Sequence, residues 1–578
     1  MAPTDQLQEV KIMLHGTAAS EGIGIGKVML IEEHSLEYTP RTVTDTEAES
    51  QRFKAAVDAF CYNTEKQAEN LRSSAGEKEA EILAGHIQII KDPYLSGEIE
   101  KLIADGQCAE SALEHMCDMF IAMFSAADDE LTKQRAADVR DIKSGVLGIL
   151  LGVNEIKVSD APKGTVLVAR ELTPSVTAGI VKENIAGIIT ETGGTTSHSA
   201  ILARALEIPA VLSVEGVASS LKNGDTVVVD GSEGAVIVNP DDNTVAEYSK
   251  KRDAFLAERK ELENYRGRET KSASGEVYEL FCNIGKPEDA VKAVDADGEG
   301  VGLFRTEFLF MDRTSIPTED EQFEAYKKAA LILKGKSLII RTLDIGGDKD
   351  IPYLGLEKEE NPFMGFRAIR YCLKNRELFK SQIKAILRAS AFGDIKIMFP
   401  LITTMDELRE GKKLVAECKA DLRNMGINFN ENIQVGVMVE TASAAVIADM
   451  LAKEADFFSI GTNDLTGYTM ACDRGNNDVS YLYSPLQPRV LRMIKRTIEC
   501  GVQNGISVGM CGEAAANKLM IPLLISFGLT EFSVSAPSVL NVRKIISTWT
   551  KEEADKVTAK VLEMSTQQEI VEYLKSVV

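Results

Sequence analysis

The motif GGTTSHSA places a single histidine, His198, where a strand is expected to give way to a helix. Residues 185–190 (IAGIIT) are typical of a short buried strand, and residues 199–206 (SAILARAL) have the apolar spacing of a helix. The glycines allow a tight turn, Thr196 or Ser197 can cap the helix, and His198 then lies at the positive end of the helix dipole. This position suits an imidazole that carries phosphate, while a structural histidine in a tight turn is the alternative.

A second set of polar residues follows apolar runs in the C-terminal half of the chain. Eight runs of strand type are separated by helical patterns: YELFCNI, GVGLFRT, SLIIRTLD, IKIMFPL, QVGVMVE, FFSIGTND, SVGMCGE and EFSVSA. Eight β units in about 300 residues predict a (β/α)8 barrel, whose active sites lie at the carboxyl ends of the strands. Polar residues occur at those ends: Asn283, Arg305, Arg341 with Asp344, Glu440, Asn463 with Asp464, and Cys511 with Glu513.

The arginines at this rim predict an anion site. Arg305 and Arg341 end two of the runs, Arg474 lies just beyond another, and Arg367 and Lys349 come from nearby loops. Guanidinium groups bind paired oxygens, so a ligand with both a phosphate and a carboxylate would satisfy the cluster. A single arginine is more often part of a surface ion pair, but several at strand ends are not explained that way.

Two carboxylates at the rim predict a metal site. Glu440 and Asp464 follow neighbouring strands and offer hard oxygen ligands. Mg2+ fits such a pair, because it completes its octahedron with substrate oxygens and water. The alternative for each carboxylate is an ion pair with a rim arginine.

The motifs together resemble a known enzyme family. The segment TGGTTSHSAILARALEIPAV resembles the phosphohistidine domain of enzymes that use phosphoenolpyruvate. Later segments resemble the barrel of the same group: GVGLFRTEFLFMDR, IIRTLDIGGDK, NPFMGFRAIR, GVMVET, FFSIGTNDLTGYTMACDR and GMCGEAA. Their order in a chain of 578 residues resembles enzyme I of the bacterial sugar phosphotransferase system, over nearly the whole length. The sequence departs from the family pattern at Thr195, where arginine is common, and at Ala516-Asn517.

The resemblance implies a reaction. The phosphoryl group of phosphoenolpyruvate would pass to His198 and then to a histidine-containing phosphocarrier protein, with release of pyruvate, as the first step of sugar uptake. All five histidines lie in the N-terminal half, so the barrel has no imidazole to protonate the enolate, and the resemblance makes Cys511 the acid. A thiol with a pKa near 8.5 is largely protonated at neutral pH, although a lone cysteine is more often a core residue.

The resemblance also assigns supporting residues and partners. Thr177 and Arg204 would orient the histidine and its phosphoryl group. The substrate-binding set would be Arg305, Arg341, Asn463, Arg474, Arg367 and Lys349. The implied partners are the phosphocarrier protein, docked on an α-helical insertion, and a second copy of the chain that forms a homodimer through the barrel.

The patterns predict an α/β multidomain chain. A swivelling phosphohistidine α/β domain (residues 1–43 and 152–242) would be interrupted by an all-α carrier-binding insertion (44–151), with helix breaks near 73–76, 91–93 and 104–106. A charged linker helix (243–270) would lead to the phosphoenolpyruvate-binding barrel (271–578). The glycines at 22, 24 and 26 lack the spacing of a nucleotide loop and predict a bulge leading into a strand at 27–31.

Composition narrows the class of protein. A net charge of −23 argues against binding to nucleic acid or to anionic membranes. No apolar run approaches the ~20 residues that span a bilayer, and residues 1–16 lack a signal peptide's pattern, so we expect a cytoplasmic protein. Nine cysteines without a Cys-x-x-Cys pair give no sign of a zinc site.

Two alternatives stay open at this level. A pyruvate phosphate dikinase or phosphoenolpyruvate synthase would need a large ATP-binding domain ahead of the histidine domain, and no Gly-x-x-x-x-Gly-Lys-Ser/Thr loop is present. An inactive regulatory phosphocarrier scaffold would have lost the arginine, metal or cysteine positions, and all are present.

Overall fold

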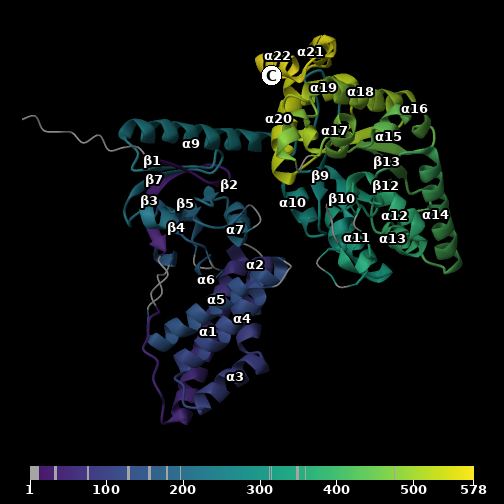
Figure 1. Cartoon of the computed structure of the whole chain (residues 1–578). Helices are drawn as coiled ribbons and strands as arrows, with labels where there is room; N and C mark the ends of the chain where they lie inside the picture. Colours follow the sequence, from purple (N-terminus) through teal and green to yellow (C-terminus); the bar gives the residue numbers. More distant parts are fainter. Residues whose placement is uncertain are drawn as a thin grey trace, which may run out of the picture. The chain divides into compact units, whose positions relative to one another are not determined.

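The computed structural model divides the chain into two compact units, one up to Arg259 and one from Lys260 to Val578 (Figure 1). The residues that the structure describes are 12–31, 36–74, 77–126, 130–153, 158–172, 174–177, 180–194, 197–311, 313, 315–346, 351–357, 359–473 and 476–578. Among these, no helix is both long and apolar enough to cross a membrane.

The first unit contains a mixed eight-stranded sheet. Its order is β1 (Ile12–His15), β8 (Ala235–Val238), β7 (Thr226–Asp230), β3 (Ile23–Ile31), β4 (Thr165–Ala169), β5 (Ile185–Thr190), β6 (Ala210–Leu212) and β2 (Thr17–Ser20). The consecutive strands β3, β4, β5 and β6 are parallel to one another. Val166 and Leu167 on β4 are buried in separate apolar clusters, so both faces of the sheet are covered.

The start of β3 differs from the prediction. The strand begins at Ile23 rather than near Lys27, and its pairing with β7 is regular from Ile23 to Lys27. Gly24 and Gly26 lie inside this strand, where a side chain would not fit. A Cβ on Gly24 would stand 2.0 Å from the carbonyl oxygen of Ala186, and one on Gly26 would stand 2.1 Å from that of Gly164. The glycines therefore permit close approach of backbone to backbone within the strand, and no bulge is present at this pairing.

The predicted all-α insertion lies between β3 and β4 and contains five helices within the described residues. They are α1 (Thr46–Ser74), α2 (Glu77–Ile90), α3 (Pro93–Ala104), α4 (Ala109–Ser125) and α5 (Glu130–Leu151), and Figure 1 shows them gathered in one bundle. Phe53, Ile99, Leu113 and Val146 share its core. Asp92 caps α3 by accepting hydrogen bonds from the amides of Tyr94 and Leu95, which explains the break predicted before Pro93.

Helix α9 (Asp242–Leu262) leads from the first unit to the second. Its residues are mostly polar and charged, and Tyr248 packs on Val228 and Ile237 of the sheet. The predicted linker (243–270) overlaps this helix, whereas the domain boundaries themselves stay predictions.

The second unit is a closed barrel of eight parallel strands, which confirms the predicted fold. The strands are β9 (Glu279–Ile284), β10 (Gly300–Arg305), β11 (Ser337–Arg341), β12 (Ile395–Phe399), β13 (Val435–Val439), β14 (Phe457–Ile460), β15 (Ser507–Met510) and β16 (Glu531–Val534). Strand β16 pairs with β9 and closes the ring. Every pairing is parallel, so all the carboxyl ends meet at one rim.

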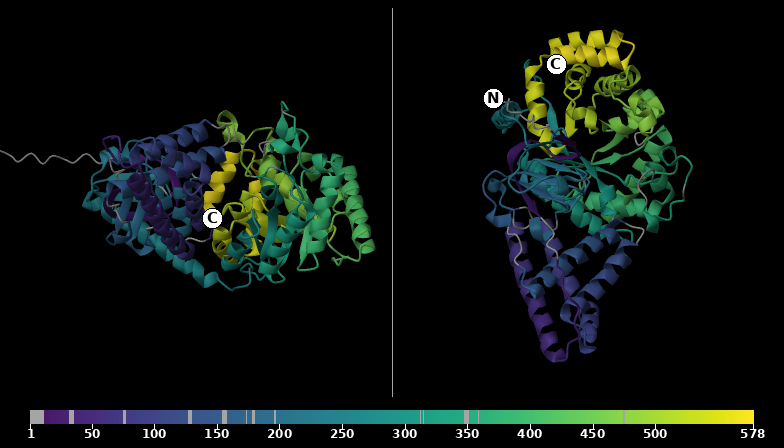
Figure 2. Two further views of the ribbon diagram at one scale, coloured as in Figure 1. Left: turned by 90° about the horizontal axis from the view of Figure 1, so that it is seen from below. Right: turned by 60° about the vertical axis from the view of Figure 1, so that its left-hand side comes forward.

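Helices surround the strands, as Figure 2 shows. They are α10 (Asp289–Asp295), α11 (Glu319–Leu333), α12 (Ala368–Lys374), α13 (Arg376–Ala389), α14 (Met405–Asn424), α15 (Ala442–Val446), α16 (Ala448–Leu451), α17 (Thr462–Met470), α18 (Pro488–Gln503), α19 (Ile521–Phe527), α20 (Val539–Thr548), α21 (Lys551–Glu563) and α22 (Gln567–Val577). Capping explains several boundaries: Thr404 and Glu407, for example, form a capping box that starts α14. In the interior of the barrel, a separate apolar cluster contains Leu303, Met438 and Cys511.

Candidate active site

The candidate nucleophile opens a helix in the first unit. Helix α7 (His198–Leu206) follows the buried strand β5, and His198 is its first residue. Ser197 is the N-cap, and its Oγ accepts a hydrogen bond from the Ala200 amide at 3.3 Å. Ala200 and Leu202 are fully buried and fix the helix on the sheet. The amide groups and the dipole at this helix start favour negative charge.

Two predicted supporting residues belong to neighbouring elements. Thr177 is the last residue of α6 (Pro174–Thr177), is buried, and α6 contacts α7. Arg204 lies on α7 itself, and its Nη1 donates to the carbonyl oxygen of Ala19 at 3.1 Å. Their predicted roles at the histidine stay predictions.

The rim of the barrel contains the predicted arginines, and two of them are paired with acids. Arg341, the last residue of β11, is buried and contacts Glu307 at 2.7 Å and Asp344 at 2.9 Å. Arg367, just before α12, contacts the other oxygen of Asp344 at 2.8 Å. Arg305 ends β10 and is partly buried. Asp344 therefore joins two guanidinium groups whose residues are distant in the sequence.

These ion pairs stabilise the charged form of both arginines. Burial alone would lower the pKa of Arg341, but the charges of Glu307 and Asp344 outweigh it and raise that pKa. The pKa of Arg367 is raised in the same way, chiefly by Asp344 and Asp464 acting against burial. Both side chains stay cationic, and Asp344 holds them in place. Our sequence interpretation missed Glu307, although its position two residues after Arg305, at the end of a barrel strand, was a usable signal.

The two candidate metal ligands lie within range of each other's charge. Glu440 follows β13 and is 1 % exposed, and its Oε1 accepts a hydrogen bond from the Leu401 amide at 2.6 Å. Asp464, in the first turn of α17, lies 3.6 Å from Arg367. Burial raises the pKa of Glu440, and the charges of Asp464 and Asp344 raise it further. A pair of hard oxygen donors with unfavourable mutual charge fits a divalent cation such as Mg2+.

Cys511 lies directly after β15, beneath the rim. It is 3 % exposed, and its thiol donates to the carbonyl oxygen of Ile460 at 3.8 Å. Burial raises the pKa of this thiol to about 11, so the sulfur keeps its proton at neutral pH. Asn283 has a structural role here, because its Nδ2 donates to the Cys511 carbonyl oxygen at 3.0 Å. Asn463 is part of the same rim, at the start of α17, and its carbonyl oxygen accepts from the Tyr483 hydroxyl at 3.0 Å.

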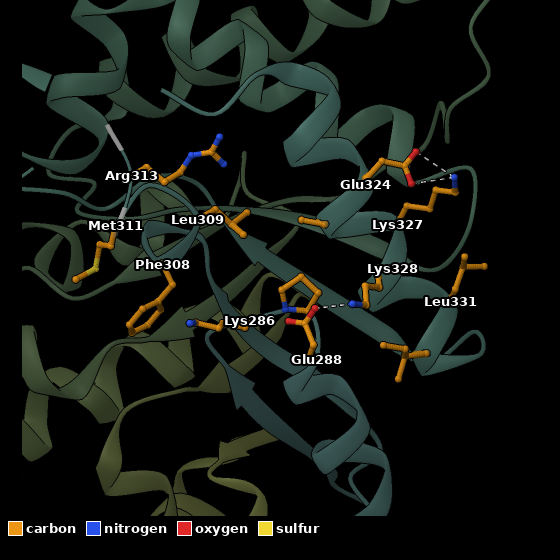
Figure 3. A pocket seen from close by; sticks show the side chains of 13 residues that line it. Lys286, Glu288, Phe308, Leu309, Met311, Arg313, Glu324, Lys327, Lys328 and Leu331 are labelled. Atoms are coloured by element: carbon orange, nitrogen blue, oxygen red, sulfur yellow. Dashed lines mark hydrogen bonds and ion pairs between the residues drawn. The ribbon is translucent and has the colours of Figure 1, made fainter. Parts of the chain in front are cut away.

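Two predicted substrate residues, Lys349 and Arg474, lie outside the described residues. A hollow of about 920 Å³ on the barrel unit is a different place (Figure 3). It is bordered by Phe308, Leu309 and residues of α11, and it includes the ion pair between Lys328 and Glu288. None of the predicted site residues in the described part of the chain lines this hollow, so it is not the rim site.

Three family models match the chain. They are the N-terminal domain (residues 15–135), the mobile domain (161–234) and the PEP-binding domain (259–550) of PEP-utilising enzymes. A phosphoenolpyruvate-protein phosphotransferase of Bacillus subtilis (strain 168) is 46 % identical over 570 residues, covering 98 % of this chain and 99 % of the relative. One from Geobacillus stearothermophilus is 46 % identical over 563 residues, covering 97 % of both. A solution structure of Enzyme I is 37 % identical with a TM-score of 0.38, covering 42 % of this chain and 99 % of that one.

Proposed function

The chain belongs to the phosphoenolpyruvate-protein phosphotransferases, and on that premise we propose that His198 carries the phosphoryl group between phosphoenolpyruvate and a phosphocarrier protein. As a member of this family, the protein is an enzyme that transfers a phosphoryl group from phosphoenolpyruvate in the sugar phosphotransferase system. The observation that carries the residue assignment is the position of His198 at the Ser197-capped start of α7. An ATP-dependent dikinase is not supported, because relatives aligned over 98 % of the chain are named as protein phosphotransferases.

Phosphoenolpyruvate would bind at the barrel rim. Arg341 and Arg367 are held rigidly by Asp344, so their guanidinium groups can take phosphate and carboxylate oxygens with little loss of side-chain freedom. Arg305 and Asn463 would complete the described part of the site. Arg474 and Lys349 stay predictions from the sequence.

Glu440 and Asp464 would hold Mg2+, which when bound neutralises charge on the substrate phosphate. This assignment is supported by the raised pKa of Glu440, which reflects burial and the nearby charge of Asp464. Like charges held close together and out of water are stabilised when a cation joins them. Asp464 also contacts Arg367, so the metal site and the anion site would be adjacent at this ion pair.

Cys511 would protonate the enolate that is left when the phosphoryl group passes to His198. Its raised pKa keeps the thiol neutral, which a proton donor requires. His198 attacks phosphorus, the bond from the enolic oxygen to phosphorus breaks, and the S–H proton moves to carbon 3 of the product. Pyruvate then leaves, and phosphorylated His198 passes its phosphoryl group to the carrier.

The nucleophile and the anion site belong to different units, so transfer requires that the units meet. Helix α9 joins them and would act as the pivot, which fits its polar sequence. The carrier would dock on the bundle α1–α5, and two copies of the chain would pair through the barrel. A cytoplasmic location stays a prediction.

The direct test is phosphorylation by phosphoenolpyruvate with Mg2+, followed by peptide mapping. We expect one acid-labile phosphoryl group on His198, and none in His198→Ala. His115→Ala is the matched control, because His115 is exposed on α4 and should leave labelling unchanged. Full labelling of His198→Ala would overturn the assignment.

A further inference from the structure

If Cys511 is the proton donor of the proposed reaction, its sulfur must regain a proton after each turnover. The thiol is 3 % exposed, so solvent has little access to it. After each turnover it would be a thiolate, and the substrate would fill the rim above it. The proton that returns the sulfur to its acid form therefore has to come through the protein.

A buried hydroxyl lies beside the sulfur. Ser459 on β14 pairs with Gly509 on β15, two residues before Cys511, so the side chains of Ser459 and Cys511 project from the same face. Ser459 is 1 % exposed, and its hydroxyl lies near enough to the Cys511 sulfur to interact with it. Burial dominates the raised pKa of Cys511, and the Ser459 hydroxyl offsets part of that effect as a donor to the sulfur. A hydroxyl in this position can pass a proton to a thiolate.

A buried carboxyl group lies on the other side of Gly509. Gly509 pairs with Glu531 on β16, so Ser459, Gly509 and Glu531 form one row across three strands. A Cβ on Gly509 would stand 2.8 Å from Glu531 Oε1, and one on Gly302 of β10 would stand 2.4 Å from the same atom. Two glycines thus make the space that the carboxyl group occupies, and Gly509 lies one strand spacing (~4.8 Å) from Ser459.

The carboxyl group is buried and holds a proton. Glu531 is 5 % exposed, and its Oε1 has no hydrogen-bond partner among the described residues. The charged groups that face it are Glu279 on β9 and Lys396 on β12. Burial raises the pKa of Glu531 to about 8, and the charge of Glu279 adds to this while Lys396 opposes it. The neutral acid therefore predominates near pH 7.

We infer that Glu531 and Ser459 form a proton relay that reloads Cys511 from inside the barrel. The inference rests on the proposed function, in which Cys511 gives its proton to carbon 3 of the enolate. The Cys511 thiolate then takes the proton of the Ser459 hydroxyl, and Ser459 takes the proton of Glu531 across one water molecule on the face of Gly509. The Glu531 carboxylate regains a proton from solvent on the side of the exposed Glu279. The net change is one proton moved from water to carbon, with no change in oxidation state.

The test uses the full-length enzyme and the exchange of pyruvate methyl protons for deuterium in D2O, with Mg2+, by mass spectrometry. Glu531→Gln and Ser459→Ala should slow this exchange and the release of pyruvate from phosphoenolpyruvate by about 10- to 100-fold, since proton transfer is worth at least that much. KM for phosphoenolpyruvate and phosphoryl exchange between His198 and the phosphocarrier should not change, because neither needs a proton at carbon. Glu531→Asp, which keeps the acid, should recover part of the rate.

The matched control is Ser337→Ala, which removes a different buried hydroxyl, at the start of β11. Ser337→Ala should leave deuterium exchange at the unchanged enzyme's rate. Normal deuterium exchange and turnover in Glu531→Gln would overturn the relay alone, and so would an equal fall in deuterium exchange and in phosphoryl exchange between His198 and the phosphocarrier. Absence of pyruvate release in the unchanged enzyme would instead overturn the proposed function.

Discussion

Asp344 and Arg341 form a buried ion pair at the mouth of the barrel, with 2.9 Å between Oδ2 and Nη1. The other oxygen of Asp344 contacts Arg367 at 2.8 Å. The pair holds the guanidinium group of Arg341 at the rim. Folding alone therefore brings these two guanidinium groups together at the rim.

Asp344→Asn should destabilise the barrel by roughly 3–5 kcal/mol, because it leaves two buried guanidinium groups with too little negative charge. Denaturant unfolding followed by a barrel-specific signal measures this loss. Asp320→Asn is the control: Asp320 contacts Arg388 at 2.8 Å, but its side chain is 81 % exposed, so its loss should cost at most about 1 kcal/mol. Equal losses in the two variants would show that the buried pair does not stabilise the rim.

Ser197→Ala should weaken the start of α7, because the Ala200 amide loses its acceptor. The expected cost is about 1 kcal/mol in the stability of the first unit, with slower phosphorylation of His198. Ser197→Asn should retain most of the stability of the first unit and most of the phosphorylation rate, since asparagine caps helices as well as serine does. If the asparagine variant were as impaired as the alanine variant, Ser197 would act by something other than capping.

Cys511→Ala should separate the two half-reactions. Release of pyruvate should fall by about 10²- to 10⁴-fold, as for loss of a general acid, while phosphoryl exchange between His198 and the carrier survives. Coupled lactate dehydrogenase measures the first rate, and phosphorylated carrier as donor measures the second. Cys500→Ala is a matched control because Cys500 is buried on α18, outside the strands. A parallel fall of both rates in Cys511→Ala would identify a structural cysteine.

The second unit alone, residues 260–578, should bind phosphoenolpyruvate in a Mg2+-dependent manner and release no pyruvate. The closed barrel contains the arginines and the carboxylates, whereas His198 is in the other unit. Calorimetric titration with Mg2+ and with a chelator is the measurement. Failure to bind in a fragment whose circular dichroism shows a folded barrel would mean that the first unit supplies ligands.

Glu531 should make barrel stability depend on pH. Its pKa rises from 4.5 in the unfolded chain to about 8 in the fold, so the folded state binds one more proton between these values. Stability should therefore fall as pH rises across that window and be highest below it. Glu531→Gln should flatten the dependence by a few kcal/mol, at ~1.4 kcal/mol per pKa unit. The comparison is the difference in unfolding free energy between the two proteins at several pH values; parallel curves would show that Glu531 does not titrate in this range.

The sequence by itself determined the elements and the rim. Apolar runs such as 185–190 and 457–464 are local signals of strands, and parallel strands bring their carboxyl ends together whatever the loops do. That is why Arg341, Glu440 and Cys511 could be placed at one rim of the barrel from the sequence. The helix start at His198 was equally local, because it depends on a capping residue and neighbouring glycines.

Only the tertiary structure decided which groups contact one another. The pairing of Arg341 with Glu307 joins residues 34 positions apart, and no periodicity encodes it. The sequence predicts Glu531 only as the first residue of a strand. Its carboxyl group is buried because β16 pairs with β9 to close the barrel, and because glycines on β10 and β15 leave space for it. Burial and pairing are properties of atoms brought together from distant segments. A sequence pattern therefore predicts the element and strand end on which a residue lies. It does not predict the burial and the neighbouring charges that set the pKa of its side chain.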